Sequence, residues 1–101
     1  MSGPRRYRDD APPNRHLNAF LEMMAAERGA AANTLDAYRR DLVDFAGFLK
    51  RRGRPLEAAD STNIRDYLAA IRAHGQKSTT SARRLSALRQ FYAFLFAEKI
   101  R

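Results

Sequence analysis

Apolar residues recur at three- and four-residue steps in four separate segments of the chain. That period is typical of amphipathic helices with one buried face, and no segment alternates in the manner of a strand. The pattern therefore predicts an all-α fold of four helices with short connections. The four predicted apolar stripes are Leu17, Phe20, Leu21 and Met24; Leu35, Tyr38, Leu42, Phe45 and Leu49; Ile64, Tyr67, Leu68 and Ile71; and Leu85, Leu88, Tyr92, Leu95 and Phe96.

Glycines and short polar side chains mark where these helices begin and end. A glycine in the left-handed conformation commonly follows a helix, and Asn, Asp, Ser or Thr commonly caps its start. Leu56, in the connection before the third helix, is expected to pack onto the bundle. The predicted helices run from 14–16 to Gly29, from an Asn33 or Thr34 cap to Arg52, from a cap within 60–62 to Gly75, and from a Ser78 or Thr79 cap to Phe96.

The first fourteen residues differ from the rest of the chain. They show no apolar periodicity and contain three prolines, three arginines (Arg5, Arg6 and Arg8) and two aspartates. Such a composition is typical of a segment that does not fold by itself. We therefore expect 1–14 to be a flexible, basic tail and 15–101 to be one small domain.

The last predicted helix carries a polar stripe roughly opposite its apolar one. At about 100° per residue, Thr79, Arg83, Ser86 and Gln90 share this stripe, and two further arginines lie on its flanks. Hydroxyl, amide and guanidinium groups contact DNA phosphates and base edges, although a solvated helix face explains the same pattern. Arg83, in the middle of this stripe, is expected to contact base edges. The flanking Arg84 and Arg89 are expected to meet phosphates, or Arg89 to pair with Glu22 or Asp66 inside the bundle.

The charge of the chain favours a polyanionic partner. The formal net charge is +8, and residues 77–101 hold six basic residues against Glu98 alone. An excess of positive charge on one segment points to nucleic acid, with an anionic membrane surface as the alternative. No apolar run approaches the ~20 residues of a membrane span. The sequence thus predicts a soluble, cytoplasmic protein that binds no membrane.

No arrangement of residues indicates catalysis, a metal or a cofactor. The chain has no cysteine, and His16 and His74 stand far apart without neighbouring ligands. It has no glycine-rich phosphate loop and no defensible nucleophile with a base. The carboxylates Asp41 and Asp44 share a helix with Arg39 and Arg40, so salt links within that helix are their expected role. We expect a non-catalytic fragment without cofactors.

Four segments resemble one known family. FLEMMAAERGAAANTL, NTLDAYRRDLVDFAGFL, DSTNIRDYLAAIRAHG and STTSARRLSALRQFYAFL are similar, in order, to the four helices of the core-binding domain of Xer-type tyrosine recombinases. The resemblance covers about residues 16–101, and TLDAYRRDL together with ARRLSALRQFY is its more specific part. It implies a SAM-like orthogonal bundle of four helices. It also implies a catalytic domain with the nucleophilic tyrosine, which would lie beyond Arg101.

The resemblance implies which residues meet DNA. In this family the second and fourth helices lie across the major groove of a recombination half-site. Two positions depart from the usual pattern, because Gln76 stands where the family has leucine and Ser81 where it has an apolar residue. Together with the polar stripe, the resemblance gives the expected DNA-binding residues Thr34, Arg39, Arg40, Lys77, Ser78, Thr79, Thr80, Arg83, Arg84, Ser86, Arg89 and Gln90.

The leading hypothesis is the DNA-binding domain of a site-specific recombinase that integrates or resolves DNA. Its partners would be a duplex half-site, the catalytic domain of the same protein and other recombinase protomers. Two alternatives remain open at this point. One is a free-standing helical transcription regulator, against which the length of the last helix argues. The other is a helical protein-interaction module whose basic face binds an acidic partner.

Overall fold

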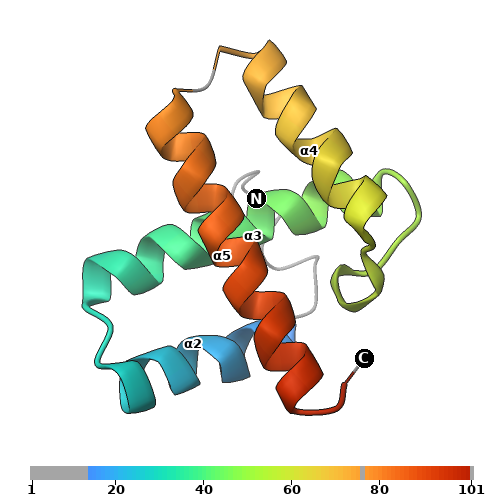
Figure 1. The fold of residues 1–101 in the computed structure, drawn as a ribbon. Helices are drawn as coiled ribbons and strands as arrows, with labels where there is room; N and C mark the ends of the chain where they lie inside the picture. The colour runs from blue at the N-terminus through green and yellow to red at the C-terminus, as the bar shows by residue number, and fades with distance from the viewer. Residues whose placement is uncertain (1–13, 76, 101) are drawn as a thin grey trace, which may run out of the picture.

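The four predicted helices are present and form two crossed helical pairs (Figure 1). The computed structural model describes residues 14–75 and 77–100, so residues 1–13 of the expected 1–14 tail lie outside it, as do Gln76 and Arg101. The elements are α2 (Arg15–Arg28), α3 (Ala32–Lys50), the short 3-10 helix η1 (Leu56–Ala58), α4 (Ser61–Ala73) and α5 (Ser78–Ala97). Within the described residues there is no strand. The predicted all-α SAM-like bundle is thus confirmed.

The helices pack as two hairpins that cross steeply. In Figure 1, α2 and α3 run side by side below and behind, and α5 passes across both on its way from the α4 end to the C-terminus. Helices α3 and α5 each touch all of the other three helices, so the bundle is built around the crossing of these two. The largest fully buried apolar side chains come from α2, α3 and α5: Phe20, Leu42, Phe45, Leu49, Leu88, Phe91 and Leu95.

Several predicted boundaries are confirmed by the hydrogen bonds at the helix ends. The Asn14 side chain accepts from the backbone N–H groups of His16 and Leu17, and Gly29 ends α2 with a left-handed φ of 63°. Asp60 caps α4 through a reciprocal capping box with Asn63. Leu56 is buried as expected, and its carbonyl accepts a hydrogen bond from the Tyr92 hydroxyl at 2.6 Å.

Two predicted N-caps are wrong. Helix α3 starts at Ala32 behind Ala31, which provides no side-chain cap. The run of alanines before Asn33 favours helix strongly enough to extend α3 past the expected caps. Likewise α5 begins at Ser78, behind Lys77, with no side-chain cap. Thr34 and Thr79 therefore lie within the first turns of their helices.

The buried face of α5 also differs from the predicted one. Leu88 and Leu95 are buried as expected, whereas Phe96 is 77% exposed. Phe91, which the predicted stripe omits, is fully buried and packs edge-on against Phe20 with ring centroids 5.5 Å apart. The helix is therefore rotated about its axis relative to the predicted orientation, away from Phe96 and toward Phe91.

Candidate nucleic-acid interface

A groove rich in arginine lies where α5 crosses α3. Its volume is about 490 Å³, and four of its seven lining side chains are arginines. The two helices contribute jointly, which explains why sequence segments forty residues apart form one surface. We call this the α3–α5 groove; its lining residues are Arg39, Arg40, Asp41, Val43, Asp44, Arg83 and Arg84.

Arg83 is held by a buried carboxylate at the floor of this groove. Asp41 is only 1% exposed. It accepts hydrogen bonds from Nε of Arg83 at 2.9 Å and from Nη2 at 2.7 Å. These hydrogen bonds to Asp41 raise the pKa of Arg83 above its ordinary value, so the guanidinium remains charged.

Arg84 belongs to a second cluster beside the first. Its Nη1 donates to Asp44 at 2.8 Å and to the Tyr67 hydroxyl, which itself donates to Asp44 at 2.6 Å. Burial opposes the charge of Arg84, but the interactions with Tyr67 and Asp44 outweigh it and raise its pKa. Burial and the Asp44 hydrogen bond raise the pKa of Tyr67 as well, so the phenol stays protonated. Arg84 is 19% exposed, and this cluster ties α3, α4 and α5 together.

These partners correct the salt links expected within α3. Asp41 and Asp44 pair with arginines of α5, and the expected pairs with Arg39 and Arg40 are not the ones that form. Residues two apart on a helix, such as Arg39 and Asp41, do not face each other. The carboxylates therefore link the two helices of the groove.

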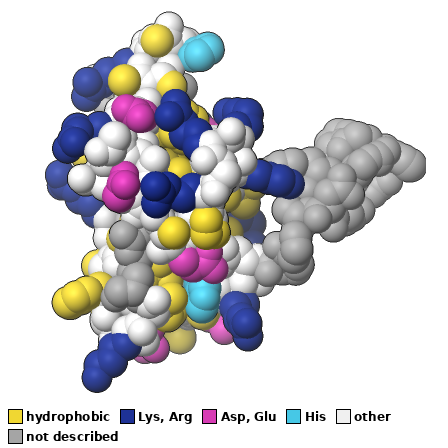
Figure 2. Space-filling view, turned by 90° about the vertical axis from the view of Figure 1, so that its right-hand side faces the viewer, with side chains coloured by type: hydrophobic (Ala, Val, Ile, Leu, Met, Phe, Trp, Pro, Cys, Tyr) yellow, Lys and Arg dark blue, Asp and Glu magenta, His cyan; other side chains and the backbone are white. Residues whose placement is uncertain are grey.

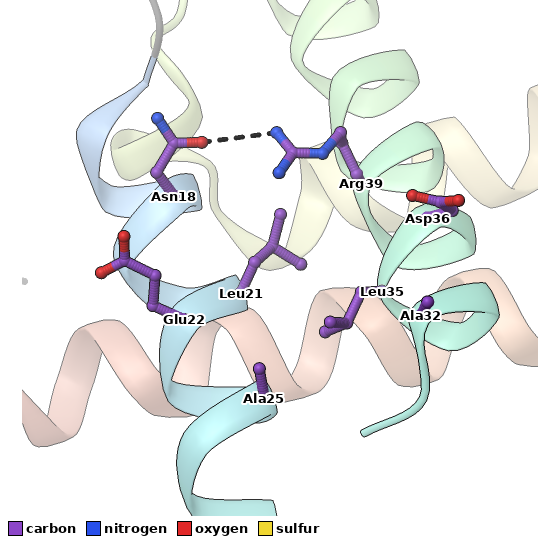
Figure 3. A pocket seen from close by; sticks show the side chains of 8 residues that line it. All are labelled: Asn18, Leu21, Glu22, Ala25, Ala32, Leu35, Asp36 and Arg39. Atoms are coloured by element: carbon purple, nitrogen blue, oxygen red, sulfur yellow. Dashed lines mark hydrogen bonds between the residues drawn. The ribbon is translucent and has the colours of Figure 1, made fainter. Parts of the chain in front are cut away.

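Arg39 lies between two neighbouring grooves. Its guanidinium reaches toward α2, where Nη1 approaches Oδ1 of Asn18 at 3.4 Å, as Figure 3 shows. That second groove, of about 430 Å³, is lined on the α2 side by Leu21 and Ala25 and on the α3 side by Ala32, Leu35 and Asp36 among others. Arg40, by contrast, is exposed and has no hydrogen-bond or ion-pair partner among the described residues.

The polar stripe of α5 is bonded to its neighbours rather than simply solvated. Nε2 of Gln90 donates to the Tyr38 hydroxyl at 3.0 Å and to the Ser86 hydroxyl at 3.2 Å. The Gln90 carbonyl accepts from Nη1 of Arg28 at 3.2 Å. Ser86 and Gln90 thus extend the contact between α5 and α3 away from the arginines, and both are only half-buried.

The other expected residues lie apart from the α3–α5 groove. Thr34 is exposed in the first turn of α3, and Lys77, Ser78 and Thr79 are exposed at the start of α5, with Thr80 half-buried. Arg89 is exposed, and within the described chain it pairs with neither Glu22 nor Asp66; Asp66 lies 3.5 Å from Arg52 instead. The structure therefore unites only four of the twelve expected residues in one groove.

Sequence reasoning missed the part that Asp41 plays in the site. A signal was present, because Asp41 stands three residues after Tyr38 and four before Phe45. That spacing puts a carboxylate within the buried stripe of α3. A charged group in such a position is almost never buried without a partner, and the observed partners, Arg83 and Arg84, lie on α5.

Positive charge is spread over the surface around these helices. Figure 2 shows Lys and Arg side chains over the upper and lower parts of one face, more widespread than Asp and Glu. In the described part of the chain, no helix is both long and apolar enough to span a bilayer. The fold and the groove together define a small helical domain with an arginine-lined surface suited to a phosphate-bearing polymer.

Comparison with known proteins gives the family. The chain belongs to the family described as phage integrase, N-terminal SAM-like domain, whose model matches residues 17–99. No solved structure gives a significant match.

Curated relatives share more than half of their residues with this chain over the matched region. Tyrosine recombinase XerD of Rhizobium meliloti (strain 1021) is 56% identical over 86 residues, which are 85% of this chain and 28% of the relative. The XerD of Agrobacterium fabrum is 51% identical over 102 residues, covering 100% of this chain and 30% of the relative. The XerD of Caulobacter vibrioides is 53% identical over 81 residues, which are 80% of this chain and 27% of the relative. The chain thus spans less than a third of these relatives' length.

Proposed function

We propose that this domain binds one half-site of duplex DNA for a tyrosine recombinase that acts in the cytoplasm. Helices α3 and α5 would lie across the major groove. Strand cleavage would belong to a catalytic domain of the same protein, and further protomers would occupy the remaining half-sites. The relatives are named tyrosine recombinase XerD, which favours a Xer-type recombinase over a phage integrase as the parent protein.

The observation that carries the proposal is the α3–α5 groove. Four arginines from two crossed helices line it, and guanidinium groups suit both phosphate oxygens and the guanine edge. The major groove of B-DNA is about 12 Å wide and admits a helix. A surface made by two crossed helices can insert one of them and brace the other against the backbone.

The remaining residues have distinct proposed roles. Arg83, fixed at the floor of the groove, is the candidate for a base contact. Arg40 and Arg89 are exposed and are candidates for phosphate contacts. The backbone N–H groups at the uncapped start of α5 would favour a phosphate beside Lys77 and Thr79. Arg84 is taken up by Asp44 and Tyr67, so its contribution would be to hold the helices in place.

The test is a comparison of two arginine substitutions that change the charge equally. Arg40→Ala removes an exposed cation of the α3–α5 groove, and Arg65→Ala removes an exposed cation of α4 that, among the described residues, bonds only to Thr62 of its own helix. Affinity for a random-sequence duplex would be measured across a salt series. A phosphate contact adds about one unit to the slope of log K against log salt.

Arg40→Ala is expected to lower that slope by about one unit and to weaken binding, while Arg65→Ala leaves the slope near that of the unsubstituted chain. Equal effects of the two substitutions would show that charge alone drives binding and that the groove is not the site. Absence of salt-dependent duplex binding by the unsubstituted chain would overturn the DNA-binding proposal itself and favour an acidic protein partner.

A further inference from the structure

Asp41 is the one charged side chain among the buried residues of the described chain. Both of its oxygens are engaged by Arg83, and Nε of Arg84 lies 3.8 Å from Oδ1. A buried carboxylate that loses its partner is strongly destabilising. Arg83 is therefore unable to leave Asp41 for a ligand without leaving that buried charge to the more distant Arg84 alone.

The geometry of the pair leaves half of Arg83 free. A guanidinium carries five N–H donors in one plane. Asp41 takes the edge formed by Nε and one hydrogen of Nη2, so both hydrogens of Nη1 and the second hydrogen of Nη2 remain. They point away from Asp41 because the group is planar. The Arg83 side chain is 42% exposed and lines the α3–α5 groove, so this outer edge is accessible.

We propose that Asp41 is a positioning residue, which fixes the outer edge of Arg83 in the α3–α5 groove as a ready-made fork for two acceptor atoms of DNA. The inference rests on the proposed DNA-binding function. Two acceptors of the right spacing occur on a phosphate group and on the O6 and N7 edge of guanine. Asp44 is a useful contrast, because its side chain is 56% exposed and it binds the Nη1 end of Arg84 together with the Tyr67 hydroxyl.

Positioning matters because a free arginine side chain must be ordered when it binds. Ordering one flexible side chain at an interface weakens binding by about 2- to 10-fold. In this domain the ordering is already complete before DNA arrives, since Arg83 is held at two points by a carboxylate that is itself packed in the core. Loss of the Asp41 carboxylate should therefore weaken DNA binding, although the removal of a negative charge would by itself strengthen it.

The test compares Asp41→Asn with Asp36→Asn. Asp36 is an exposed carboxylate on the same helix without a hydrogen-bond or ion-pair partner in the described chain, so both variants gain one unit of net positive charge. On a random-sequence duplex, Asp41→Asn is expected to bind about 2- to 10-fold more weakly than Asp36→Asn. In addition, Arg83→Ala should weaken binding less in the Asp41→Asn background than in the unsubstituted chain.

A second variant covers the case in which Asp41→Asn fails to fold. Arg83→Lys keeps the charge beside Asp41 but cannot present a fork while paired. It should bind more weakly than the unsubstituted chain with an unchanged salt slope. Circular dichroism would check that each variant is folded.

The outcomes separate the two proposals. If the unsubstituted chain binds duplex and Asp41→Asn binds as tightly as Asp36→Asn, or tighter, positioning is wrong and the DNA-binding function stands. Arg83→Lys binding like the unsubstituted chain would also overturn positioning. If the unsubstituted chain binds no duplex, both proposals fall. A duplex enriched from a randomised pool, compared with the random-sequence duplex, distinguishes the two acceptors. An equal loss of affinity of Asp41→Asn on both duplexes indicates phosphate, and a larger loss on the enriched duplex indicates a base edge.

Discussion

Truncation of Phe91 is the sharpest test of how α5 sits in the bundle. Phe91 is fully buried, and its ring meets those of Phe20 at 5.5 Å and Tyr92 at 5.1 Å. Phe96, five residues later on the same helix, is 77% exposed. The two phenylalanines allow one substitution to be made on each face of α5, with the same number of atoms removed.

The structure predicts that the two truncations change the free energy of unfolding by very different amounts. Phe91→Ala removes a buried ring and leaves a cavity against Phe20, which should lower the free energy of unfolding by about 3–5 kcal/mol. Phe96→Ala removes mainly solvated surface and should change it by less than about 0.5 kcal/mol. A domain of this size is stable by about 5–15 kcal/mol, so Phe91→Ala leaves a measurable folded population.

Equilibrium urea unfolding followed by circular dichroism would measure both changes. The corresponding shift in melting temperature is roughly 4–8 °C for each kcal/mol. Equal destabilisation by the two substitutions, or a larger effect of Phe96→Ala, would show that α5 has the orientation predicted from sequence and that the observed packing is wrong. Phe91→Leu serves if the alanine variant is too unstable to study.

Two further substitutions test polar groups of the same helix bundle. The pKa of Tyr67 is raised above its ordinary value of 10.0 in the folded state, so its stabilising contribution is present below pH 10.0 and is lost as the pH rises above it, by up to about 1.4 kcal/mol per pH unit. Tyr67→Phe should therefore flatten the alkaline decline in the free energy of unfolding measured with urea. An unchanged decline would contradict the burial of the phenol. The Ser81 hydroxyl is buried without a hydrogen-bond partner among the described residues, so Ser81→Ala should raise the free energy of unfolding by about 1 kcal/mol. Ser86→Ala, which loses the hydrogen bond from Gln90, is the control, and destabilisation by Ser81→Ala would mean that its hydroxyl is bonded.

The helices and most of their ends could be predicted from the sequence because those features are local. The apolar stripe of α2 is buried as predicted, and Asn14, Gly29 and Asp60 act at the expected helix ends. The start of α3 could not be predicted in this way, because three alanines allow a helix to begin before any side-chain cap. Local signals compete there, and helix propensity prevails over capping.

The orientation of α5 could not be predicted because its sequence offers two overlapping faces. At about 100° per residue, the centre of the buried set Ser81, Ala87, Leu88, Phe91 and Leu95 lies about 60° from the centre of the predicted stripe.

That rotation places Arg84 near the middle of the buried face, where Asp44 and Tyr67 on other helices bind its guanidinium. It also carries Arg83 toward Asp41. The observed face therefore pairs both arginines with carboxylates on α3, which pattern analysis of α5 alone does not include. Asp41 also leaves Arg83 fixed and partly exposed, so the packing of α5 against α3 and the shape of the candidate DNA-binding groove depend on the same ion pair.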